Sequence, residues 1–147
     1  MNDAPYFLDV NVPMYAAGKA HPYKEACAWI LTEIAHGRLE AVIDTEIIQE
    51  VLYRYGAIQQ WPVGMQMAEN LLALIPVVLP VTVEDMHTAV SFFTQYAPHG
   101  VKARDVLHTA VMQNHQITHI ISTDKHFDQI DGIIRLDPQD HYVKFNT

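Results

Sequence analysis

The sequence is poor in cysteine and has no long hydrophobic run. Its 147 residues include one cysteine, Cys27, so an internal disulfide is impossible, and the apolar helical pattern around it predicts a buried thiol. The longest apolar stretch, residues 71–83, is interrupted by two prolines and is shorter than the ~20 residues that span a bilayer. No basic segment followed by a long apolar one opens the chain, so we expect no signal peptide and a cytoplasmic protein.

Basic residues are also scarce. Nine lysines and arginines stand against seventeen acidic residues, which gives a formal net charge of −8 and argues against a broad basic surface for nucleic acid. A nucleic-acid substrate is still compatible with this charge, because divalent cations held by clustered acids attract phosphate. The positions of the acids are therefore the most informative feature.

Half of the residues are hydrophobic, and the length suits a single domain over residues 1–147. Short apolar runs predict five strands, at residues 6–10, 39–43, 77–81, 117–121 and 133–136. Helical spacing of apolar residues predicts the intervening helices, at residues 23–34, 47–56, 65–75, 83–96 and 102–115. Asn11 and Pro13 indicate a turn, and Asp137-Pro138 ends the last strand. This alternation predicts an α/β fold with a parallel sheet covered on both faces.

Four acids lie at the ends of predicted strands or on the helices next to them. Asp9 ends the first strand, Glu50 lies on the helix after the second, Asp105 begins the helix before the fourth, and Asp124 follows the fourth. Because the carboxyl ends of parallel strands meet at one edge of a sheet, we expect these acids to surround one crevice. Their mutual repulsion would leave some of them protonated unless cations were present, so the pattern predicts a divalent-metal site.

Each of these acids also has a plain structural explanation. Asp9 is suited to a helix N-cap or a buried salt bridge, and Glu50 to a solvated helix surface. Asp105 in a first turn is favoured by the helix dipole. A different helix register would exchange Glu50 for Glu46. Arg104 is a candidate either for an ion pair with an acid or for a phosphate contact.

Oxygen ligands without cysteine or histidine at metal-ligand spacing favour Mg²⁺ or Mn²⁺ over Zn²⁺. Such ions lower the pKa of a bound water and stabilise charge on a phosphodiester under attack. The sequence therefore predicts hydrolytic chemistry.

Four motifs together resemble the PIN domain family, in particular the small VapC-like ribonuclease toxins, over nearly the whole chain. The motifs are L-D-V-N-V at residues 8–12, T-E-I-I-Q-E at 45–50, R-D-V-L-H-T-A at 104–110 and S-T-D-K-H-F-D at 122–128. The resemblance implies a flavodoxin-like three-layer α/β/α fold with strand order 3-2-1-4-5. It also implies an acidic metal centre and RNA as the substrate.

The same resemblance implies roles for individual residues. The catalytic acids would be Asp9, Glu50, Asp105 and Asp124, of which Asp9, Asp105 and Asp124 would bind the metal. Supporting roles would fall to Asn11, Thr45, Thr123 and Asp128. The first three would hydrogen-bond to the acids, and Asp128 would hold a metal-bound water. Val10 departs from the family pattern, which often has a small hydroxyl residue there. The family further implies a homodimer and a partner antitoxin.

Other functions remain as alternatives. A PIN nuclease that processes RNA without being a toxin, or a non-catalytic binding module with the same fold, would share the motifs. A receiver-type phosphoacceptor needs an aspartate at the end of the third strand, and residues 77–81 have none. A phosphatase of the haloacid dehalogenase type needs Asp-x-Asp after the first strand, where this chain has Asp9-Val10-Asn11.

Overall fold

The computed structural model describes residues 5–146, and its centre is a five-stranded parallel sheet. The strands are β1 (Tyr6–Leu8), β2 (Ala41–Asp44), β3 (Val77–Leu79), β4 (His119–Ile121) and β5 (Ile134–Leu136). Their order is β3-β2-β1-β4-β5, with Tyr6 of β1 in register with Ala41 on one side and His119 on the other. The predicted strand order is confirmed, including the place of β3 at an edge.

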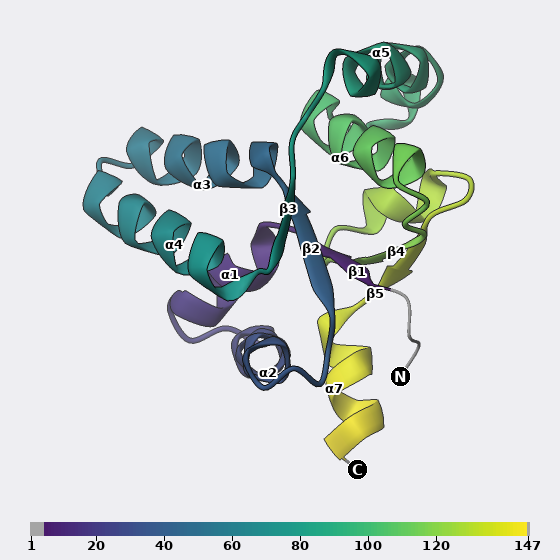
Figure 1. The fold of residues 1–147 in the computed structure, drawn as a ribbon. Coiled ribbons are helices and arrows are strands. Elements are labelled where there is room, and N and C mark those ends of the chain that lie inside the picture. Colours follow the sequence, from purple (N-terminus) through teal and green to yellow (C-terminus); the bar gives the residue numbers. More distant parts are fainter. Residues whose placement is uncertain (1–4, 147) are drawn as a thin grey trace.

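Helices cover both faces of this sheet (Figure 1). Two of them, α5 (Val83–Tyr96) and α6 (Ala103–Asn114), pack together on one side. On the other side lie α1 (Asn11–Ala17), α2 (Lys24–Ala35) and α7 (Pro138–Asn146). The pair α3 (Thr45–Ala57) and α4 (Trp61–Leu74) extends outward from the ends of the strands, and short 3₁₀ turns form η1 (Ala97–His99) and η2 (Lys125–Gln129). This is the predicted three-layer α/β/α arrangement.

The core forms where the central strands meet the two helical layers. Phe7, Ile43, Ile120 and Ile121 are completely buried, whereas Val77 on the edge strand β3 is exposed. Full burial of such an apolar side chain contributes about 1.5 to 3 kcal/mol relative to exposure. The central strands are therefore fixed in register, and with them the residues that follow their carboxyl ends.

The first strand is shorter than predicted, and the turn predicted at Asn11 is wrong. β1 ends at Leu8, and α1 begins at Asn11. Pro13 is compatible with this helix because it lies in the first turn, where its missing N–H has no intrahelical acceptor. Val12 and Pro13 are buried, so packing favours the helix. Asp9 consequently lies in the connection between β1 and α1.

A last helix, α7, begins directly after Asp137, where the sequence analysis had no further element. Pro138 is its first residue, which suits a helix N-terminus, and the Asp137 carboxylate accepts a hydrogen bond from the Gln139 amide at 2.9 Å. The hydroxyl of Tyr23 donates to the same carboxylate at 2.7 Å. These contacts join α7 to the region of α2.

Cys27 is fully buried in α2, as predicted. Burial raises the pKa of its thiol to about 12, so the thiol stays protonated at neutral pH and is a packing residue. Across residues 5–146, every helix falls short of the length and hydrophobicity that crossing a bilayer requires.

Candidate functional site

A cleft of about 540 Å³ lies where β1 and β4 end, and it collects the predicted acids. Carboxylates of Asp9, Glu50, Asp105 and Asp124 line it, together with Asn11. These side chains come from the β1–α1 connection, α3, α6 and the β4–η2 connection. The acids share one crevice, as expected, because the segments that carry them meet at one edge of the parallel sheet.

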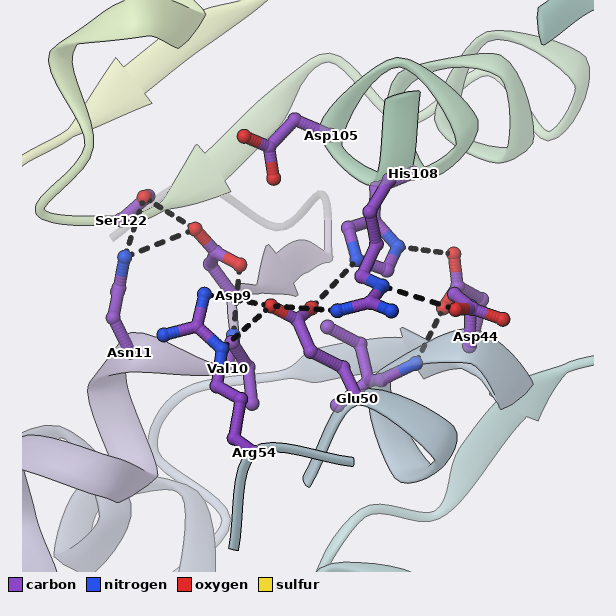
Figure 2. Close-up of polar contacts among 12 residues, drawn as sticks. Asp9, Val10, Asn11, Asp44, Glu50, Arg54, Asp105, His108 and Ser122 are labelled. Atoms are coloured by element: carbon purple, nitrogen blue, oxygen red, sulfur yellow. Dashed lines mark hydrogen bonds and ion pairs between the residues drawn. The ribbon is translucent and has the colours of Figure 1, made fainter. Parts of the chain in front are cut away.

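Asp9 is held in place by three donors (Figure 2). Its Oδ1 accepts from the Val10 amide at 2.8 Å, and its Oδ2 accepts from Asn11 Nδ2 at 3.1 Å and from Ser122 Oγ at 2.6 Å. Burial raises the pKa of the Asp9 carboxyl, and the hydrogen bond from Ser122 opposes that shift only in part. Asp9 is thus rigidly oriented in a position that disfavours its charge.

Ser122 joins the two connections that carry Asp9 and Asp124. Besides donating to Asp9, its Oγ accepts from the Asp124 amide at 3.0 Å and from Asn11 Nδ2 at 3.2 Å. The Asn11 side-chain oxygen accepts from the Thr123 amide at 3.3 Å, so Thr123 reaches this network through its backbone. The sequence analysis placed Ser122 in a motif but gave it no role.

Glu50 is almost fully buried and paired with cations. Its Oε2 lies 2.8 Å from Arg54 Nη2 and 3.9 Å from Arg104 Nη1, and its Oε1 lies 3.4 Å from His108 Nε2. Burial opposes ionisation of Glu50, but His108 and Arg54 together hold the pKa of its carboxyl below the ordinary value. Glu50 is therefore an ionised member of a charge chain.

His108 lies between Glu50 and Asp44 with no exposed surface. Its Nδ1 is 2.7 Å from Asp44 Oδ2, and the other Asp44 oxygen caps α3 by accepting from the Ile47 amide at 3.0 Å. Burial opposes the charged ring, but Asp44 and Glu50 outweigh it and raise the pKa of His108 to about 10. The sequence analysis gave neither Asp44 nor His108 a role in the site. The signal was present, since Asp44 ends β2 and His108 lies about one turn after Asp105.

Asp105 faces the other acids from the first turn of α6. Its carboxylate points into the space beside Asp9 and Glu50 in Figure 2, and only 9% of the residue is exposed. Burial, together with the negative charge of Asp9, raises the pKa of Asp105 to about 7. The Asp105 carboxyl is therefore close to half-protonated at neutral pH.

Asp124 caps the short turn η2 on the far side of the cleft. Its Oδ1 accepts from the His126 amide at 2.9 Å and lies 2.8 Å from His126 Nδ1. Burial opposes ionisation, but these contacts with His126 lower the pKa of the Asp124 carboxyl. Asp124 therefore contributes a negative charge to the cleft at neutral pH.

Of the four predicted supporting residues, only Asn11 lines the cleft, whereas Thr45, Thr123 and Asp128 lie outside its lining. The hydroxyl of Thr45 accepts a hydrogen bond from the Val81 amide at 3.2 Å. Asp128 forms a two-point ion pair with Arg135, at 2.9 and 3.1 Å.

The fold also distinguishes Glu46 from Glu50, the two acids of the motif at residues 45–50. Glu46 pairs with Arg104 at 3.2 Å, and Glu50 rather than Glu46 lines the cleft. The guanidinium of Arg104 lies 5.1 Å from the centre of the Tyr53 ring, at the rim of the same cleft. Arg104 is thus both an ion-pair partner and a cation beside the acids.

This arrangement of fold and acids agrees with the result of a family comparison. The model of the PIN domain family matches residues 6–133. The chain belongs to the PIN domain family. Among its PIN relatives is ribonuclease VapC13 of Mycobacterium tuberculosis, which is 35% identical over 129 residues, covering 88% of this chain and 97% of the relative.

Solved structures give the same PIN fold. The chain matches VapBC2 of Rickettsia felis, crystallised with a DNA fragment from its promoter, with a TM-score of 0.69 and 16% identity over 89% of this chain and 96% of the other. It also matches a toxin–antitoxin complex from Klebsiella pneumoniae, with a TM-score of 0.63 and 16% identity over 90% of this chain and 97% of the other.

The PIN cleft contains groups able to bind a metal ion. Ligand atoms of Asp9, Glu50 and His108 lie within 4.8 Å of one another. His108 Nδ1 lies 2.7 Å from Asp44 and Nε2 lies 3.4 Å from Glu50, an arrangement that favours a hydrogen on each ring nitrogen over a free lone pair. The donors that suit a cation are therefore carboxylate oxygens.

Proposed function

We propose that this protein is a metal-dependent ribonuclease that hydrolyses RNA phosphodiesters and acts as the toxin of a type II toxin–antitoxin pair. The observation that carries the proposal is the cleft in which Asp9, Glu50, Asp105 and Asp124 converge. Its relative VapC13, named a ribonuclease, matches the chain at 35% identity over nearly its full length. We therefore favour a toxin over a processing nuclease or a non-catalytic binding module.

Asp9, Asp105 and Asp124 would hold a Mg²⁺ or Mn²⁺ ion, because their donors are hard oxygen atoms and their carboxylates line one cleft. When bound, such an ion lowers the pKa of a water molecule and stabilises the charge that develops on the phosphodiester. Asn11 and Ser122 fix the direction of the Asp9 oxygens through their hydrogen bonds. In a PIN nuclease this support would set the distance between the acids.

The rim of the cleft supplies the positive charge that an RNA strand needs. Arg54, Lys102 and Arg104 line it, although the whole chain is acidic. Tyr53 lies beside Arg104, and 59% of Tyr53 is exposed. We infer that the cations contact phosphates and that the exposed ring is available to stack on a base.

An RNA cleavage assay tests the enzymatic proposal. Purified protein with Mn²⁺ should cleave end-labelled RNA, and a chelator should stop cleavage. Asp9→Asn should be inactive, whereas Glu69→Gln, which changes an exposed acid on α4, should cleave at the wild-type rate. Cleavage that persists in chelator, or in the Asp9 variant, would contradict the assignment of the acids.

The toxin assignment has its own test. Induced expression in a bacterial host should arrest growth for the wild type and leave it unaffected for Asp9→Asn at equal protein level. Normal growth with active wild-type nuclease would instead favour an RNA-processing enzyme. Because RNA is the proposed substrate, we expect the protein to act in the cytoplasm.

We also propose a homodimer and an antitoxin partner. Large apolar side chains are unusually exposed along α5, among them Val83 (74%) and Val90 (66%). Apolar surface of this kind marks protein contacts. Light scattering after size-exclusion chromatography should give twice the chain mass for the wild type, and Val90→Lys tests whether this surface forms the dimer contact.

A further inference from the structure

The end of the cleft nearest β2 already contains fixed positive charge. His108 is buried between the carboxylates of Asp44 and Glu50, with an oxygen 2.7 Å from Nδ1 and another 3.4 Å from Nε2. A neutral imidazole has one N–H and would direct its bare nitrogen at a carboxylate oxygen in the buried interior. With both carboxylates ionised, this geometry favours a doubly protonated ring.

Both oxygens of Glu50 are used by cations of the protein. His108 faces Oε1, while Oε2 accepts from Arg54 Nε at 3.0 Å and lies 2.8 Å from Arg54 Nη2. A divalent ion at Glu50 would have to displace these partners or lie beside two positive charges. In this half of the site, the carboxylates of Asp44 and Glu50 face His108 and Arg54, and Arg104 adds a third cation 3.9 Å from Glu50 Oε2.

The other half of the cleft is different. The carboxylates of Asp9, Asp105 and Asp124 line it, and the donors to Asp9 are neutral: the Val10 amide, Asn11 and Ser122. Asp105 is buried here as well, with 9% of the residue exposed, and its carboxylate faces the space beside Asp9 (Figure 2). Asp124 lies 2.8 Å from His126 Nδ1, whereas Asp9 and Asp105 form no ion pair among the residues that the structure describes.

We propose that His108 is a positioning residue that stands in place of a second metal ion, so that the site binds one divalent ion per chain, on the side of Asp9, Asp105 and Asp124. This inference rests on the proposed metal-dependent function. In this arrangement Glu50 belongs to a chain of ion pairs with Arg54, His108 and Asp44. The single metal ion binds beside this chain, on the side of the other three acids.

Mn²⁺ binding to the metal-free wild-type protein tests the inference without any RNA. Isothermal titration calorimetry should give one ion per chain, and the electron paramagnetic resonance spectrum at saturation should be that of isolated Mn²⁺. Two ions per chain, or a spin-coupled pair, would overturn the inference even if the protein cleaves RNA. One bound ion without cleavage would count against the nuclease function and leave the inference standing.

His108→Gln removes the built-in charge while retaining a polar side chain. We expect this variant to bind a second Mn²⁺ per chain, because Glu50 and Asp44 lose their shared cation. His87→Gln, at an exposed position of α5, is the matched control and should still bind one. Binding by His108→Gln that equals the wild type in number and affinity would show that His108 does not exclude a second ion. If the variant does not fold, the number of Mn²⁺ ions bound by the wild type still tests whether the site holds one ion.

Discussion

The hydroxyl of Ser122 donates a hydrogen bond of 2.6 Å to Asp9, although the two residues are 113 positions apart in the chain. The same hydroxyl accepts from the Asp124 amide at 3.0 Å. A single side chain therefore couples the acid that follows β1 to the acid that follows β4. We expect this bridge to help set the separation of the two acids.

Replacing Ser122 by alanine should loosen the site without removing a carboxylate. We expect Mn²⁺ affinity to fall by about 10- to 100-fold, as for other residues that orient metal ligands. RNA cleavage should fall with it at subsaturating Mn²⁺. Calorimetric Mn²⁺ titration provides the measurement, with Ser91→Ala on the exposed surface of α5 as control. Unchanged affinity in Ser122→Ala would argue against this bridge as a determinant of the site.

Asp105→Asn should stabilise the metal-free protein at alkaline pH. The pKa of Asp105 is raised from 3.8 to about 7, so ionising it costs folding free energy as the pH rises between these values. Removing the charge should increase the free energy of unfolding by about 1 to 3 kcal/mol at pH 8, and the gain should vanish near pH 4. Urea denaturation in chelator at both pH values measures this. A variant less stable than wild type at pH 8 would contradict it.

The stability contributed by His108 should be greatest at low pH and should fall as the pH rises above 6.5. Its pKa is raised from 6.5 to about 10, so its favourable contribution is complete below pH 6.5 and is lost as the pH rises towards 10. The difference in unfolding free energy between wild type and His108→Gln should therefore shrink from pH 6.5 to pH 9.5. Nitrogen-15 NMR at pH 7 should show both ring nitrogens protonated, and a neutral ring would refute this charge state.

Glu46 and Glu50 should respond differently to the same substitution. Glu46→Gln breaks a partly exposed pair with Arg104, so we expect a stability loss of about 1 kcal/mol or less and cleavage within about threefold of wild type. Glu50→Gln leaves the buried His108 charge short of a partner, which should cost about 3 to 5 kcal/mol and abolish cleavage. Activities compared at low temperature, with the folded fraction checked by circular dichroism, separate the two effects. Equal activity losses would mean that Glu46 also belongs to the site.

The sequence by itself determined the fold class and identified the acids of the candidate site. Short apolar runs separated by helical spacing require a covered parallel sheet, and residues at the ends of such strands must meet at one edge. Asp9 and Asp124 could be placed near each other on this basis, because each directly follows a buried strand. Local pattern was weaker at residues 11–17 and 138–146, where Pro13 and Pro138 suggested breaks but each lies at the start of a helix.

Only the tertiary structure decided which polar residues serve the acids. His108 and Asp44 are 64 positions apart, and the packing of α6 against the sheet brings them to 2.7 Å. On α3, Glu50 lines the cleft and Glu46 lies outside its lining. Periodicity specifies which face of a helix is buried, but the partner met by a buried polar group depends on how separate elements dock. The distribution of charge within the site is therefore a property of the assembled fold.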